Sequence, residues 1–153
     1  MKQSPFKLRA LLISVAIVLA VLSFLVVKIN PAKTVGNNLC FNQTCFKVEI
    51  ASATNDRQTG LMNRDSLDQD KGMLFVFDKE GNYPIWMKNT KFPLDVIWIN
   101  KDGKVVDVQT LSPCTSGSCP SFSAKSNAKY ILEINSGLAS KDNIKIGDKA
   151  DLR

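Results

Sequence analysis

The 153-residue sequence contains no histidine. This absence removes the most common general base, the usual partner of a serine or cysteine nucleophile, and the most common zinc ligand. Acidic residues are missing from the first thirty positions, which carry four basic ones: Lys2, Lys7, Arg9 and Lys28. The remaining residues hold 16 basic and 14 acidic side chains, so most of the formal charge of +6 comes from the N-terminal segment. This balance predicts no nucleic-acid partner.

The longest apolar stretch, residues 10–27, has no charge and is interrupted only by Ser14 and Ser23. As a helix it would be about 27 Å long, close to the ~30 Å hydrocarbon core of a bilayer. It is longer than the apolar part of most signal peptides, and no clear cleavage site follows it. We therefore predict an uncleaved signal anchor. A cleaved signal peptide and a buried helix of a soluble domain are the alternatives.

The basic residues around the apolar stretch predict a cytoplasmic N-terminus and an extracytoplasmic remainder. The chain then has a cytoplasmic segment (residues 1–9), a transmembrane signal anchor (10–29), a linker (30–39) and one extracytoplasmic domain (40–153). Pro31 and Gly36, without apolar periodicity around them, are typical of a linker. The predicted location is the cell membrane, with a single pass.

The four cysteines form two pairs with the same spacing, Cys40/Cys45 and Cys114/Cys119. Zinc sites and thioredoxin-like motifs usually have two residues between the cysteines instead of four. Outside the cytoplasm, an even number of cysteines is typical of disulfides. We predict two local disulfides, the first closing a hairpin and the second closing a loop, and no metal or cofactor. A four-cysteine metal site and redox chemistry are the alternatives.

Short apolar segments between turn residues predict a mainly β domain. Residues 46–50 alternate apolar and polar, and residues 73–77 form the continuous apolar run of a buried strand. Asp102-Gly103 is typical of a hairpin turn between residues 96–99 and 104–108. Further strands are expected at 85–87, 130–134 and 149–152, and short helices at 54–65, capped by Thr54, and at 137–143. Seven or eight short strands favour a β-sandwich or a partly closed barrel, with one or two short helices.

Several motifs follow one another in a specific order: Arg57 to Arg64 around Gly60-Leu61-Met62, Gly72 to Phe77, Trp86-Met87-Lys88-Asn89-Thr90, Pro93 to Ile97, Cys119-Pro120, Tyr130 to Glu133, Gly137 and Gly147-Asp148. This series resembles the domain-of-unknown-function family 192 of bacteria and archaea, from about Phe46 to Leu152. The resemblance implies a compact, mainly β, jelly-roll-like domain, often behind a signal or an anchor. It implies no agreed activity and supplies no catalytic residue.

Six polar or aromatic side chains stand out within apolar sequence: Arg64, Trp86, Lys88, Asn89, Asp95 and Glu133. One interpretation is structural, because a buried charge needs a partner and such residues often form internal ion pairs and turn hydrogen bonds. The other is a ligand-binding cleft in which Trp86 and Trp98 form an aromatic platform for a sugar, a peptide or an anionic group. Alternation along a strand predicts that Trp86 and Lys88 are exposed while Ile85 and Met87 fill the core.

The sequence thus favours a non-catalytic, membrane-anchored binding or envelope-accessory domain. Its expected partner is an envelope glycan, peptide or protein, in addition to the membrane around the N-terminal helix. A carboxylate-dependent envelope hydrolase is the first alternative, because Asp95 and Glu133 could act as general acid and base without histidine. A structural or assembly partner in a membrane complex is the second.

Overall fold

The structure, a computed structural model, describes residues 37–114 and 118–153. The predicted cytoplasmic segment, the predicted anchor and residues 30–36 of the predicted linker lie outside this part of the chain. Within residues 37–114 and 118–153, no helix is long and apolar enough to cross a membrane.

The described chain is mainly β. Its strands are β1 (Asn38–Phe41), β2 (Thr44–Ala51), β3 (Lys71–Gly81), β4 (Ile85–Trp86), β5 (Leu94–Ile99), β6 (Val105–Leu111), β7 (Ser121–Phe122), β8 (Ala128–Asn135) and β9 (Ala150–Leu152). Two short helices, α2 (Thr54–Thr59) and α3 (Leu138–Lys141), connect them. Seven strands form one sheet in the order β6-β5-β8-β3-β2-β1-β9, while β4 and β7 form a separate ribbon. Neighbouring strands are antiparallel except for β2 and β3, which are parallel.

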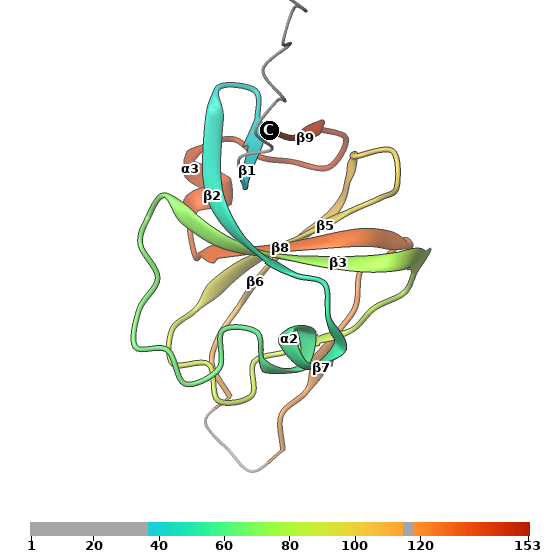
Figure 1. The fold of residues 1–153 in the computed structure, drawn as a ribbon. Coiled ribbons are helices and arrows are strands. Elements are labelled where there is room, and N and C mark those ends of the chain that lie inside the picture. Colours follow the sequence, from blue (N-terminus) through green and yellow to red (C-terminus); the bar gives the residue numbers. More distant parts are fainter. Residues whose placement is uncertain (1–36, 115–117) are drawn as a thin grey trace, which may run out of the picture. The chain divides into compact units, whose positions relative to one another are not determined.

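The large sheet curls into a half-barrel (Figure 1). An isolated bridge between Lys104 and Lys149 brings its two ends together. Beside this bridge, the Ala150 amide donates to the Gly103 carbonyl at 2.8 Å, and the Val105 amide donates to the Asp148 carbonyl at 2.9 Å. The mainly β prediction is therefore confirmed. Of the two predicted architectures, the curled sheet agrees with the partly closed barrel and not with the jelly-roll-like sandwich.

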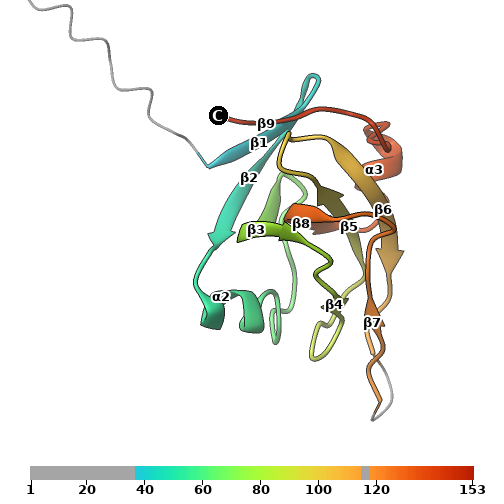
Figure 2. The same cartoon turned by 90° about the vertical axis from the view of Figure 1, so that its right-hand side faces the viewer.

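The central strands are buried on both faces of the sheet. Every residue of β5 is buried, which explains why its sequence shows no alternation. Leu74, Ile97 and Leu132 belong to the apolar cluster that includes α3 and β9. Their neighbours Phe75, Trp98 and Ile131 belong to a second cluster, which includes residues of β4 and of the loop after α2. Figures 1 and 2 show α3 and β9 at one end of the domain and α2 with the β4–β7 ribbon at the other.

Most predicted elements lie close to their expected positions, but four details differ. Helix α2 ends at Thr59 instead of residue 65, because the chain turns at Gly60 with φ of 49°. The N-cap of α2 is Ala53 rather than Thr54. The short strand β7 and the parallel pairing of β2 with β3 were not predicted.

Both predicted disulfides are confirmed. Cys40 and Cys45 lie opposite each other in the β1–β2 hairpin and are bonded. Cys114 and Cys119 are also bonded to each other. The four cysteines are therefore all oxidised, so they form neither a metal site nor a reduced redox pair.

Candidate ligand-binding site

The candidate site is built around Glu133 in the middle of β8. Its cross-strand neighbours are Met73 of β3 and Val96 of β5, and its side chain is only 5% exposed. Because side chains alternate along a strand, Glu133 shares the face of Ile131, which belongs to the cluster near α2 and β4. The glutamate thus enters a largely apolar region.

No described residue forms a hydrogen bond or an ion pair with the Glu133 carboxyl. Burial alone raises the pKa of this carboxyl from its usual 4.5 to about 8. At neutral pH the group is therefore mostly protonated. Within the described chain, every fully enclosed side-chain oxygen or nitrogen has a hydrogen-bond partner. The Glu133 carboxyl accordingly keeps some contact with the space beside it.

That space is a small hollow of about 20 Å³, which has room for roughly one water-sized group. The hollow is lined by the end of α2 and the turn after it, together with residues of β3, β4, β8 and the turn after β4. These residues are Arg57, Gln58, Thr59, Gly60, Leu61, Met62, Phe75, Ile85, Trp86, Thr90 and Glu133. Thr90 is itself buried, with 8% of its surface exposed. Thr90 and Glu133 therefore bring two oxygen-bearing side chains to one small space.

Trp86 forms the rim of the hollow and is 45% exposed. The ammonium of Lys88 lies 5.1 Å from the centre of the Trp86 ring, a cation–π contact. Ile85 and Met87 are buried, so the predicted alternation of this segment is confirmed. Strand β7 positions the tryptophan, because Trp86 pairs with Ser121 across the small ribbon.

Asn89 lies beside this rim in the turn after Lys88. It is exposed and adopts a φ of 54°. Its carbonyl accepts a hydrogen bond from the Asn63 amide at 2.8 Å. Asn89 thus joins its own turn to the loop that follows α2, and both segments bear residues of the hollow.

Asp95 lies on the opposite face of the sheet from Glu133. The register pairs Val96 with Glu133, so the adjacent Asp95 points to the other side of β5. Asp95 is 1% exposed. It accepts hydrogen bonds from the Thr110 hydroxyl at 2.6 Å and from the Ala139 amide at 2.8 Å. The structure therefore does not bring the two carboxyls of the hydrolase hypothesis together.

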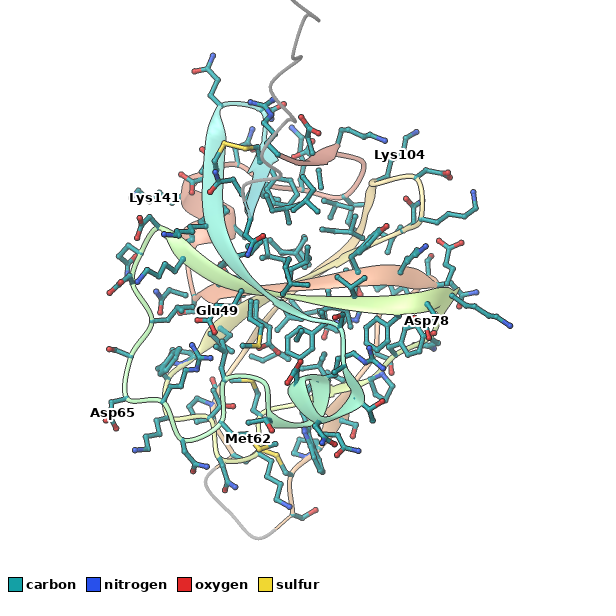
Figure 3. All side chains as sticks on the ribbon, in the orientation of Figure 1. Glu49, Met62, Asp65, Asp78, Lys104 and Lys141 are labelled. Atoms are coloured by element: carbon teal, nitrogen blue, oxygen red, sulfur yellow. A yellow bond between two sulfur atoms is a disulfide. The ribbon has the colours of Figure 1, made fainter. Side chains whose placement is uncertain are left out.

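Arg64 forms a two-pronged ion pair with Glu49, with nitrogen–oxygen distances of 2.6 and 2.7 Å. Its guanidinium lowers the pKa of Glu49. The two residues line a broader hollow of about 390 Å³ that shares Thr59 and Gly60 with the small one. Figure 3 labels Glu49, which borders the broader hollow, and Met62, which borders the small one. Arg64 thus borders the neighbouring hollow and not the one above Glu133.

Trp98 was predicted to share an aromatic platform with Trp86, and the structure places it elsewhere. Trp98 is fully buried, and its indole N–H donates to the Tyr83 carbonyl at 3.3 Å. Of the predicted residues, Trp86 and Glu133 line one hollow, and Lys88 contacts Trp86. Thr90 and the turn at Gly60-Leu61 were missed. In the sequence they stand out only as members of the ordered motifs, near Trp86 and Met62. Membership of a motif does not show that two segments meet in the fold.

The fold and the site define a mainly β half-barrel domain in which a buried glutamate, with no partner among the described residues, lies beside an exposed tryptophan. The chain belongs to the domain-of-unknown-function family 192 (DUF192, uncharacterised ACR), whose family model matches residues 38–152. No curated protein matches the chain.

Two solved structures are similar to this chain. A protein of unknown function from Novosphingobium aromaticivorans DSM 12444 is 30% identical, with a TM-score of 0.68 over 74% of this chain and 83% of its own. A protein from Sinorhizobium meliloti 1021, whose description proposes a transcription regulator, is 29% identical, with a TM-score of 0.66 over 74% of this chain and 89% of its own.

Proposed function

We propose that the domain is a non-catalytic binding module and that its ligand occupies the hollow above Glu133. We name this site the Trp86–Glu133 site, formed by Trp86, Lys88, Thr90, Glu133 and the Gly60-Leu61 turn. The observation that carries the proposal is the buried Glu133 carboxyl, for which no described residue is a partner. An unpaired buried carboxyl opposes folding, and strongly perturbed ionisable groups are concentrated at functional sites.

Binding is favoured over hydrolysis by the geometry of the carboxyls. Hydrolysis by two acids needs one carboxyl group on each side of the bond that is broken. Asp95 is turned to the opposite face and is engaged by Thr110 and Ala139. Within the described chain, no second ionisable group contributes to the pKa of Glu133. One carboxyl beside a small hollow suits the anchoring of a ligand group.

The proposed setting of the module is the extracytoplasmic side of the cell membrane, held by the anchor at residues 10–29. The two disulfides support an oxidising compartment, and the uncharged stretch at residues 10–27 supports the anchor. The ligand would then belong to an envelope peptide, protein or glycan. Protease added to spheroplasts should digest the domain and leave a short membrane-bound fragment. Complete protection of the domain would contradict this placement.

The binding site can be tested by an NMR screen of small sugars, short peptides and simple amines against the ¹⁵N-labelled protein. Binding fragments should shift the Trp86 indole and Thr90 amide signals. The shift of the Thr90 amide should disappear in Trp86→Ala and persist in Ile146→Ala, an exposed apolar residue outside the site with 60% of its surface exposed. Fragments that bind equally well to Trp86→Ala, or a screen with no binder at these signals, would contradict the proposal.

A further inference from the structure

We infer that the ligand group received by the Trp86–Glu133 site is a primary ammonium on an unbranched aliphatic stem, of the kind a lysine side chain presents. This inference rests on the proposed function and specifies the chemistry of the same site. Three features support it: the lack of a cation at Glu133, the size of the hollow, and the exposed indole at its rim.

The positively charged side chains around the hollow already have other partners. Arg57 donates to the carbonyls of Ser52 and Val76 and lies over the Phe77 ring at 5.1 Å. Arg64 is paired with Glu49, and the Lys88 ammonium lies against Trp86. Since burial is the sole cause of the raised pKa of Glu133, none of these cations stabilises its ionised form. An incoming ammonium would supply the missing charge.

The size of the hollow restricts what can enter. A volume of about 20 Å³ accepts a single small group such as –NH₃⁺. An amine on a sugar ring, or the α-amine of a peptide, is attached to a branched carbon that is too broad to follow it. A lysine side chain ends in four methylenes in a row, so its ammonium can enter while its stem remains outside. The exposed face of Trp86 offers that stem an apolar surface.

The chemistry of the two groups is complementary. An ammonium has three donors and no acceptor, and an ionised carboxyl has only acceptors. Charge-assisted hydrogen bonds of this type are stronger than neutral ones. Thr90 brings a hydroxyl oxygen to the same hollow as a further acceptor. When the ammonium binds, the Glu133 carboxyl loses its proton to solvent, and the ammonium keeps all of its own.

This proton release gives the inference a distinctive pH dependence. In the free protein Glu133 holds its proton up to about pH 8. Ammonium binding must expel that proton, so affinity should rise about tenfold per pH unit between pH 6 and 7.5. A neutral acceptor such as a peptide carbonyl would instead bind the protonated carboxyl, so its affinity would stay nearly constant up to about pH 8 and fall only above it. A tenfold slope below pH 8 therefore separates the two modes of binding.

The experiment uses the full-length protein and three tripeptides at millimolar concentration, with chemical shifts of Trp86 and Thr90 as the readout. The first is Gly-Lys-Gly with both ends blocked, the second is its Nε-acetylated twin, and the third is Ala-Ala-Ala with a free α-amine on a branched carbon. Only the first should bind, with the tenfold pH slope. Glu133→Gln should weaken it at least tenfold and abolish the slope, while Ile146→Ala should leave both unchanged. Glu133→Gln keeps the shape of the side chain, and its amide spectrum confirms folding.

Equal binding of the acetylated peptide, binding through the α-amine, or an affinity that is level or falls between pH 6 and 7.5 would overturn the ammonium inference. The proposed binding function would survive these results if fragments still shifted the Thr90 amide in the wild type and not in Trp86→Ala. A failure of all three peptides would likewise overturn the ammonium inference. The absence of any fragment bound at the site would overturn the binding function as well.

Discussion

At the scale of single residues, the two tryptophans occupy opposite environments. Trp86 is 45% exposed, whereas Trp98 is fully buried and hydrogen-bonded to the Tyr83 carbonyl. Trp86→Ala should change the free energy of unfolding by no more than about 0.5 kcal/mol. Trp98→Ala should lower it by about 3–5 kcal/mol, because truncation leaves a cavity. Urea denaturation of both variants measures the difference, and a large loss in Trp86→Ala would show that Trp86 belongs to the core.

Glu133 makes the stability of the domain depend on pH. The folded protein keeps the proton of this carboxyl up to about pH 8, whereas a carboxyl in the unfolded chain releases it near 4.5. Between these two pH values the folded state binds more protons than the unfolded state. The free energy of unfolding therefore falls as the pH rises from 4.5 to 8, by about 1.4 kcal/mol per pH unit. Denaturation at pH 5.5 and 7.5 should show this loss in the wild type. Glu133→Gln should lack it; the same loss in the variant would assign the slope to other groups.

The sequence could not distinguish the roles of Asp95 and Glu133. Both are acidic residues within apolar strand sequence, and both are buried. What separates them is the face of the sheet to which each points, and this depends on the register between β5 and β8. A shift of one residue would exchange the faces. Because β5 is buried on both sides, its sequence lacks the alternation that would reveal this register. By contrast, β4 does alternate, and the exposure of Trp86 was predictable.

At the scale of elements, Asp95 of β5 supports helix α3 from outside. The N-cap residue of this helix is Gly137, which has no side chain to accept a hydrogen bond from the first turn. The Asp95 carboxylate accepts the Ala139 amide instead. Asp95→Ala should therefore destabilise the protein by about 2–4 kcal/mol, because two donors lose their acceptor. It should also speed hydrogen exchange of the Ala139 amide.

The control for this prediction is Lys141→Ala, an exposed position on the same helix, which should change stability by less than about 0.5 kcal/mol. Equal effects of the two substitutions would contradict the supporting role of Asp95. Unlike this long-range contact, the β5–β6 hairpin was predictable from Asp102-Gly103, since its turn residues are adjacent in sequence. The parallel β2–β3 pair was not, because its strands are joined through α2 and a long loop.

At the scale of the whole domain, the half-barrel is held closed where Gly103 meets Ala150. Gly103 has a φ of 75°, and a Cβ added to it would lie 3.0 Å from the Ala150 carbonyl oxygen. Gly103→Ala therefore adds a steric clash to the cost of a positive φ and should lower stability by about 2–3 kcal/mol. Gly147→Ala is the matched control. Its φ is 96°, but a Cβ there meets nothing within 4 Å.

Thermal denaturation compares these two variants, and hydrogen exchange of the Ala150 amide, which donates to the Gly103 carbonyl, reports on closure directly. Gly103→Ala should have the lower melting temperature and the faster exchange. A larger effect of Gly147→Ala would show that the clash does not govern closure. This closure was not predictable from sequence, because it joins segments more than forty residues apart mainly through backbone hydrogen bonds.

The neighbouring positions of β1 and β9 also fix the order in which the domain can be completed. The first strand of the domain pairs with the last, Leu39 opposite Leu152, so the sheet cannot be finished until residues 150–152 have been synthesised. The two disulfides join cysteines only five positions apart, so each can form long before that moment. A chain that emerges into an oxidising compartment can therefore carry a stapled hairpin and a stapled loop while its sheet is still open.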